Sequence, residues 1–297
     1  MAAGWAFSLW PGFFSPAGES AAPLNLGIAC LADAHLRDGN DKCPEARGLA
    51  RAVAAIRALK PAPDLVLFAG DLAHDGDPGA LALGREILAD LPAPLLAVPG
   101  EGDGGLAGGG PWRRLFYESP FLYSFKGMHL LGLATTWQPT AWGPAFALGE
   151  EQNRWLAAKL PRLEPTKPLV VLSHAPLEPV FRPWGQWTVD SNPLLGQLAQ
   201  FPHVLCLNGH MHQAELRGQG LGVSNCITGF SNNSPLAENR ELKTENLSIP
   251  STAWPLPQAL LGTPRKLRPG LGPRGCGWLL VSGDRGGWAV EPRSWLV

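Results

Sequence analysis

The sequence predicts an α/β protein built in layers. Short apolar runs typical of strands alternate with amphipathic helix patterns from residue 24 onward, which favours layered α/β construction over a β-sandwich alone. Polar clusters follow several of the apolar runs, and the 36 glycines and 30 prolines among 297 residues fit strands that end in many turns. No internal repeat is evident, so we expect one domain, long enough for an ample core.

The predicted elements alternate along the chain. The runs that predict strands are residues 24–31, 64–69, 95–98, 168–172, 204–208, 223–228, 278–281 and 287–291, with a strand or hairpin at 122–134. The segments with helical periodicity are residues 45–59, 79–91, 149–160 and 192–200. This order is the one expected of a layered α/β fold.

Two segments fall outside the alternation. Residues 1–23 are apolar and aromatic and look like the back half of an export signal without its basic start, so they are either a remnant of such a signal or an ordinary N-terminal arm. These alternatives also leave the compartment open: a signal remnant implies the periplasm, and an N-terminal arm implies the cytoplasm. Residues 231–273 are rich in Asn, Pro and Ser and too long for an ordinary connection, which predicts a loop-rich excursion that caps a site or meets a partner.

The composition excludes several classes of protein. The 24 basic and 25 acidic side chains give a formal net charge of −1, which disfavours a protein that coats nucleic acid. No run of about 18 apolar residues occurs, so a transmembrane span is excluded, and the 45% of hydrophobic residues excludes a disordered chain. The five cysteines form no CxxC pair and imply neither a zinc knuckle nor a disulfide scaffold.

Five polar clusters follow predicted strands, and four of the seven histidines lie in them. The clusters are Asp33-Ala34-His35, Gly70-Asp71, Gly100-Glu101-Gly102-Asp103, Ser173-His174 and Gly209-His210-Met211-His212. Because the carboxyl ends of strands in an α/β sheet face a common crevice, residues from distant clusters can converge there. Imidazole and carboxylate ligands together suit Mn, Fe or Zn. One such cluster alone is more often a turn, but five in order predict a metal site.

This succession of motifs resembles the calcineurin-like metallophosphoesterase family over about residues 26–212, and within it the bacterial phosphodiesterase branch related to cyclic-nucleotide phosphodiesterases. Gln152, Trp155 and Leu156 are similar to the family's Gln-x-x-Trp-Leu helix. The resemblance implies a four-layer α/β-β/α sandwich with two metals at its centre. It also implies a metallophosphoesterase domain at residues 24–297, with the excursion at 231–273 inserted in it.

The resemblance assigns ligands to two divalent or trivalent metal ions (Mn, Fe or Zn). The set it implies is Asp33, His35 and His212 for the first metal, His174 and His210 for the second, and Asp71 as the bridge. A water shared by the two cations would become a hydroxide nucleophile that attacks phosphorus. The implied substrate is a small phosphate ester, either a phosphodiester or a phosphomonoester.

The third cluster departs from the family pattern, which reads Gly-Asn-His-Asp or Gly-Asn-His-Glu. Glu101 stands where an asparagine amide binds the second metal, and we expect its carboxylate to bind the cation more tightly while blunting its Lewis acidity. Gly102 replaces the histidine that protonates the leaving group, so restoring Asn and His at these positions is expected to raise turnover on poor leaving groups. His74 is the nearest candidate in sequence for a substitute acid; as a loop histidine it is equally explained by solvation or backbone contacts.

A second interpretation therefore stays open, and with it the question of whether the chain is an active enzyme. The chain can be a catalytically impaired, metal-binding subunit that acts as a partner-binding or assembly module. Its protein partner would bind through residues 231–273 or through the loops that carry Trp137, Trp142, Trp184 and Trp187.

Overall fold

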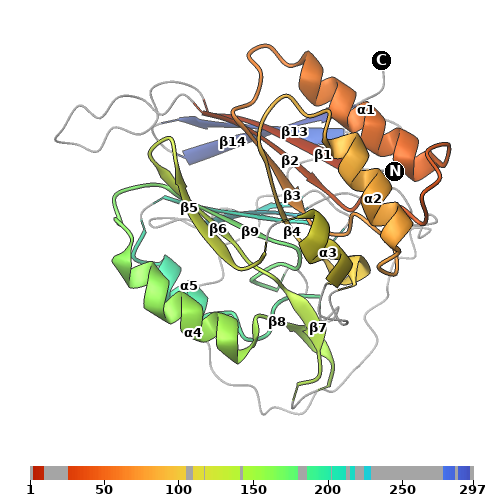
Figure 1. Ribbon diagram of the computed structural model, residues 1–297. Helices are drawn as coiled ribbons and strands as arrows, with labels where there is room; N and C mark the ends of the chain where they lie inside the picture. Colours follow the sequence, from red (N-terminus) through yellow and green to blue (C-terminus); the bar gives the residue numbers. More distant parts are fainter. Residues whose placement is uncertain are drawn as a thin grey trace, which may run out of the picture.

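The protein is a four-layer sandwich in which two sheets pack face to face and helices cover their outer faces (Figure 1). The computed structural model describes residues 3–9, 26–104, 110–116, 118–140, 143–179, 186–201, 203–211, 215–217, 224–228, 277–284 and 287–294. Helices α1 (Pro44–Ala58), α2 (Pro78–Leu88) and α3 (Gly110–Leu115) lie on one side, and α4 (Gly149–Lys159) and α5 (Asn192–Leu198) on the other. The predicted α/β-β/α sandwich is confirmed.

The first sheet has the order β1-β2-β3-β4. Its strands are β1 (Ala3–Leu9), β2 (Leu26–Ala32), β3 (Leu65–Ala69) and β4 (Leu95–Val98). The last three run parallel, so their carboxyl ends meet at one edge, while β1 pairs antiparallel with β2. The pattern of residues 1–23 did not predict β1, and its place in the sheet is a finding of the structure.

The second sheet has the order β11-β12-β10-β9-β6-β5. Its strands are β5 (Phe121–Phe125), β6 (Met128–Gly132), β9 (Leu169–Ser173), β10 (Val204–Asn208), β11 (Glu215–Arg217) and β12 (Ser224–Thr228). Strands β6, β9, β10 and β12 run parallel, and β5 and β11 run antiparallel to their neighbours. The hairpin alternative for residues 122–134 is confirmed, because Lys126 (φ 44°) and Gly127 (φ 82°) form a left-handed two-residue turn.

Two further hairpins complete the described strands. They are β7 (Thr136–Gln138) with β8 (Ala145–Ala147), and β13 (Gly277–Asp284) with β14 (Gly287–Ser294). The second confirms the two strands predicted at the C-terminal end, whereas β7, β8, β11 and helix α3 were not predicted. The excursion predicted at residues 231–273 lies outside the described residues.

Helices α1 and α2 begin where local chemistry directs them to begin. Cys43 accepts a hydrogen bond from the Ala46 amide (3.3 Å) and Asp77 accepts one from the Ala80 amide (2.7 Å), and a proline occupies the first turn of each helix. Both side chains satisfy amides that the helix itself leaves without partners.

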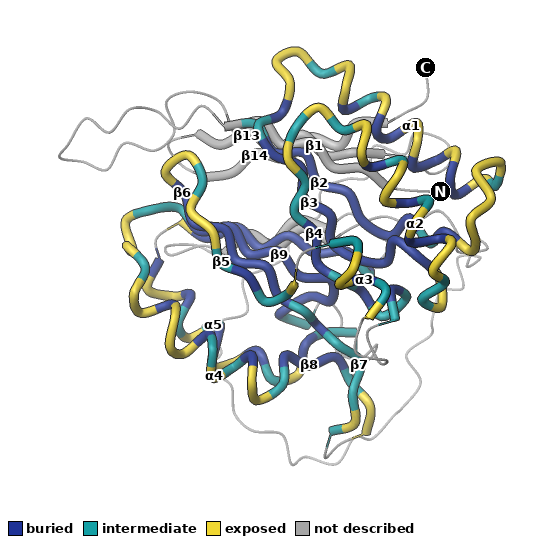
Figure 2. The backbone as a smooth tube through the Cα atoms, viewed as in Figure 1, coloured by how far each residue is buried: buried dark blue, intermediate teal, exposed yellow. Residues whose placement is uncertain are grey.

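Alternation along the strands divides the apolar side chains among three layers of core. On β2, Ile28 and Cys30 pack between the two sheets, while Ala29 and Leu31 pack under α1 and α2. A third cluster lies between the second sheet and α4 and α5. Strands β3, β6, β9 and β10 are buried along their whole length (Figure 2), and Cys30 and Cys206 pack as small hydrophobes as predicted. No helix among the described residues is long and apolar enough to cross a membrane.

Candidate metal centre

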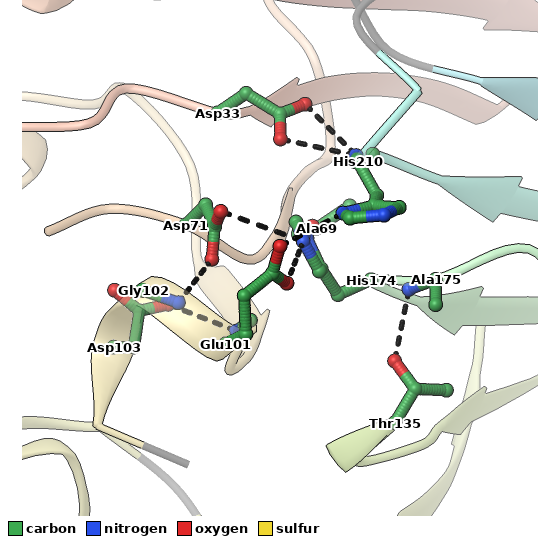
Figure 3. A network of polar contacts seen from close by, with 12 residues as sticks. Asp33, Ala69, Asp71, Glu101, Gly102, Asp103, Thr135, His174, Ala175 and His210 are labelled. Carbon is green, nitrogen blue, oxygen red and sulfur yellow. Dashed lines mark hydrogen bonds and ion pairs between the residues drawn. The ribbon is translucent and has the colours of Figure 1, made fainter. Parts of the chain in front are cut away.

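The strand ends bring the predicted site residues of both sheets together (Figure 3). These residues are Asp33 and His35 after β2, Asp71 after β3, Glu101 after β4, His174 after β9 and His210 after β10. Their potential ligand atoms form two groups, each with its atoms within 4.8 Å of one another: Asp33, His35 and Asp71 in the first group, and Glu101, His174 and His210 in the second group. His212, the remaining predicted ligand, lies outside the described residues.

The first group lies where β2 and β3 continue to pair beyond their ends. The amides of Asp33 and His35 donate to the carbonyl oxygens of Gly70 and Asp71, both at 2.9 Å. The ring nitrogens of His35 lie 3.9 Å from Asp33 Oδ1 and 3.7 Å from Asp71 Oδ2. Asp33, His35 and Asp71 all have left-handed backbone, with φ between 50° and 57°, a strained conformation that clusters at functional sites.

The second group is tighter. His174 Nε2 lies 2.8 Å from Glu101 Oε2, and His210 Nδ1 lies 3.0 Å from Glu101 Oε1. His174 Nε2 also lies 3.6 Å from Asp71 Oδ2, so Asp71 stands between the two groups. The far nitrogen of each ring has a hydrogen-bond partner, since His174 Nδ1 donates to the Ala69 carbonyl oxygen (2.7 Å) and His210 Nε2 donates to Gln186 Oε1 (2.5 Å).

Two buried atoms in this group fit a metal ion. His174 Nε2 and Glu101 Oε2 have no hydrogen-bond partner among the described residues, although they lie 2.8 Å from one another as an ion pair. A buried polar atom without a partner is costly, and a cation between the imidazole and the carboxylate would satisfy both atoms. The mixed nitrogen and oxygen donors suit Mn, Fe or Zn.

The electrostatics of the centre favour a cation as well. Burial raises the pKa of the Asp71 carboxyl well above its usual value, and the nearby carboxylates of Glu101, Asp103 and Asp33 add to the rise against the opposing effect of His174. Burial opposes ionisation of Glu101 too, but the imidazoles of His174 and His210 hold its pKa below the usual range. Several buried carboxylates this close together need compensating positive charge.

The loop after β4 holds Asp71 in place. Asp103 is buried and accepts hydrogen bonds from the amides of Ala73 (2.8 Å) and Gly100 (2.9 Å), and the Gly102 amide donates to Asp71 Oδ1 (2.7 Å). Asp103 therefore stabilises the glycine loop.

Restoring histidine at position 102 requires this loop to shift, and the expected gain in turnover stays a prediction. A Cβ on Gly102 would lie 2.5 Å from the Ala73 carbonyl oxygen, so any side chain there must displace backbone.

His74 lies beside the first group. Its side chain is 56% exposed, its Nε2 lies 3.6 Å from Asp75 Oδ2, and its ring meets that of His35 edge-on with 6.2 Å between centroids. Its role as an acid stays a prediction. Of the four tryptophans named for a docking face, Trp142 and Trp184 lie outside the described residues, and Trp137 packs edge-on against Phe146 at 4.9 Å.

Residues that support the ligands come from segments with no sequence motif for this role. Gln186 contacts His210, and Thr135 Oγ1 accepts a hydrogen bond from the Ala175 amide (2.8 Å) next to His174. Gln152, noted only as part of a motif, exchanges hydrogen bonds with the backbone of Ala134. No local pattern marks Gln186 or Thr135, because their contacts join segments that are far apart in sequence.

The comparisons with known proteins all find phosphoesterases. The family model described as calcineurin-like phosphoesterase matches residues 26–214. A protein named probable cyclic nucleotide phosphodiesterase from Synechococcus sp. is 31% identical over 211 residues, which cover 67% of this chain and 78% of the relative. The 3',5'-cyclic adenosine monophosphate phosphodiesterase of Escherichia coli is 30% identical over 178 residues, 54% of this chain and 59% of the relative. A dimetal phosphatase from Danio rerio shares the fold, with a TM-score of 0.51 and 15% identity over 68% of this chain and 86% of its own.

Proposed function

The chain belongs to the calcineurin-like phosphoesterase family, and from this premise we propose that it is a phosphoesterase that hydrolyses a phosphodiester or phosphomonoester at a centre of two metal ions. The observation that carries the proposal is the meeting of two ligand groups from both sheets with Asp71 between them. We assign the activity to one domain, residues 24–297.

The proposed ligands divide as the two groups do. The first cation is held by Asp33, His35 and Asp71, together with His212, and the second by Asp71, Glu101, His174 and His210. The orphaned His174 Nε2 and Glu101 Oε2 support the second site, and the left-handed backbone at Asp33, His35 and Asp71 supports the first. Mn, Fe and Zn are the candidates by ligand chemistry.

Bound there, two cations would supply Lewis acidity toward the phosphoryl oxygens and lower the pKa of a water molecule. The chain's own contribution is to position the ligands before substrate arrives. The Gly102 amide holds one oxygen of Asp71, which leaves Oδ2 facing His35 and His174. The His210 amide likewise donates to both oxygens of Asp33, at 3.0 and 3.2 Å. Ligands held in this way lose little further freedom during the reaction.

Protonation of the leaving group is the weakest part of this centre. Position 102 carries no imidazole, and we propose His74, exposed beside His35, as the proton donor in its place. General acid catalysis contributes about 10² to 10⁴ in rate, so substrates with good leaving groups should depend least on His74. The names of the Synechococcus and Escherichia coli relatives support a phosphodiester, with a cyclic nucleotide as the first candidate to test.

Turnover of bis-p-nitrophenyl phosphate by protein loaded with Mn, Fe or Zn tests the proposal. We expect metal-dependent hydrolysis that His174→Asn abolishes. His74→Gln should slow alkyl esters more than aryl esters, with His203→Gln, at an exposed histidine before β10, as its matched control. A protein that binds two cations and hydrolyses neither aryl nor cyclic phosphodiesters nor the monoester p-nitrophenyl phosphate would contradict the proposal and favour a binding subunit.

A further inference from the structure

We infer that the second group, Glu101, His174 and His210, is a complete site that binds its cation first and more tightly than the first group does, and that Gln186 is the residue that positions His210 for it. The inference rests on the proposed two-metal centre and concerns the order in which it fills. It depends on the carboxylate at position 101 and on the contacts that set the two imidazole rings.

Both rings of this group turn inward the nitrogen that would bind a cation. A carbonyl oxygen can only accept a hydrogen bond, so Nδ1 of His174 carries a hydrogen toward Ala69, and Nε2 is the nitrogen left to offer a lone pair to a cation. The amide oxygen of Gln186 does the same for His210, in which Nε2 carries a hydrogen and Nδ1 is left for the cation. Partners of this kind, on the ring nitrogen away from the metal, fix the tautomer and orientation of histidine ligands.

Glu101 completes the site. Its two oxygens lie 2.8 Å from His174 Nε2 and 3.0 Å from His210 Nδ1, so three donors converge without any rearrangement of the chain. Two imidazoles and a carboxylate are a donor set that holds a zinc ion by themselves. A carboxylate also adds a negative charge that an asparagine amide in this place would lack.

The first group is looser. Its ring-to-carboxylate distances are 3.7 and 3.9 Å, and both oxygens of Asp33 already accept the His210 amide. A cation entering the first group must draw its ligands closer together, whereas a cation entering the second replaces contacts that are already short. The second group should therefore fill first.

Gln186 is well placed to act as a rigid support. Two residues later the Thr188 amide donates to the Pro176 carbonyl oxygen (2.8 Å), and the Val189 amide donates to that of Phe146 (2.8 Å). The ring of Phe146 also packs edge-on against His210, with 4.5 Å between centroids. Phe146 thus holds both the segment that carries Gln186 and the His210 ring that Gln186 contacts.

Titration of the metal-free protein with Co²⁺ tests the inference, because the visible absorption of Co²⁺ reports its ligands independently of turnover. We expect the first equivalent to bind with histidine and carboxylate ligation. Glu101→Asn should weaken that equivalent at least about 10-fold, and Gln186→Leu by about 10- to 100-fold. Gln186→Glu should restore it, since a carboxylate accepts the same hydrogen bond. His35→Asn should leave the first equivalent unchanged and weaken the second, because the His35 ring belongs to the first group alone.

The opposite pattern would overturn the inference: a first equivalent that His35→Asn weakens and Glu101→Asn does not. Equal affinities for Gln186→Leu and Gln186→Glu would overturn the role of Gln186. Glu101→Gln serves as the second variant if Glu101→Asn fails to fold, as checked by circular dichroism. Turnover of an aryl phosphodiester at saturating metal reports separately on the proposed function. An active protein whose first group fills first would refute only the inference. A protein whose second group fills first but that shows no activity would refute only the proposed function.

Discussion

Gly102 is one of the residues at which this centre has no room for a side chain. A Cβ there would lie 2.5 Å from the Ala73 carbonyl oxygen and 3.1 Å from Asp71 Oδ1. We expect Gly102→Ala to lower the free energy of unfolding by about 1–3 kcal/mol, as overpacking of a tight site does. It should also weaken cation binding, because the 102 amide would move away from Asp71. Denaturant unfolding and metal titration measure the two effects.

Gly196 provides the matched control. It lies in α5, and a Cβ added to it would meet no atom within 4 Å. Gly196→Ala should therefore be neutral or stabilising by about 0.5–1 kcal/mol. Equal stability of the two alanine variants would show that the loop after β4 relaxes freely. In that case the double variant Glu101→Asn with Gly102→His would again be a reasonable way to raise turnover.

Among the elements, α4 depends on a residue distant in sequence for its N-terminal cap. Asp190 accepts hydrogen bonds from the amides of Leu148 (2.7 Å) and Gly149 (2.9 Å) and from the Asn153 side chain (3.0 Å). We expect Asp190→Ala to cost about 0.5–2 kcal/mol in thermal unfolding, as loss of a cap does. Asp190→Asn should cost less, because its amide oxygen still accepts. Identical melting of wild type and Asp190→Ala would refute this role.

Hydrogen bonds of Asp64 connect the first sheet to the second. Asp64, just before β3, accepts hydrogen bonds from the Gly27 amide (2.8 Å) and from Lys126 in the β5–β6 turn. Burial opposes its ionisation, but these two donors hold the pKa of Asp64 below its usual value. The folded state thus favours the charged form, so the stabilisation is present above the unfolded pKa of about 3.9 and is lost as the pH falls through the folded pKa.

Comparison of wild type with Asp64→Asn in chelator tests this dependence on pH. At pH 7 we expect the variant to be less stable by about 0.5–1.5 kcal/mol, the usual net value of a hydrogen bond. The difference should shrink as the pH falls below about 4. Lys126→Gln, which keeps a donor but removes the charge, should show a weaker dependence on pH. A difference that stays constant from pH 7 to pH 3 would contradict the argument.

At the level of elements, the sequence predicts best what local chemistry decides. Helices α1, α2, α4 and α5 were predicted close to their observed bounds, because periodicity and capping are properties of neighbouring residues, whereas the six-residue α3 was missed. The three-residue strands β7, β8 and β11 were missed, since so short a segment shows no period. Strand β1 was missed because its apolar, aromatic segment resembles an export signal as much as a strand.

Across the whole molecule, bound cations would join the two sheets. Asp33, Asp71 and Glu101 come from the first sheet and its loops, and His174 and His210 from the second. Saturating Mn²⁺ or Zn²⁺ should raise the midpoint of thermal unfolding, and at about 100 times Kd each site adds about 2.7 kcal/mol. Chelation should reverse the gain, and the double variant Asp33→Asn with Glu101→Gln should show almost none. Equal shifts in wild type and double variant would place the cations elsewhere.

By itself, the sequence determined the layered α/β fold, the family and the residues that converge at the strand ends. The fold and the convergence follow from spacing along the chain, because side chains repeat with period two and parallel strands end at one edge of a sheet, and the family follows from the resemblance of the motifs. Only the tertiary structure decided that Gly102 has no room for a side chain and that Gln186 sets the His210 ring. Both depend on how closely backbone and side chains from separate loops approach, and no pattern along one segment encodes that distance.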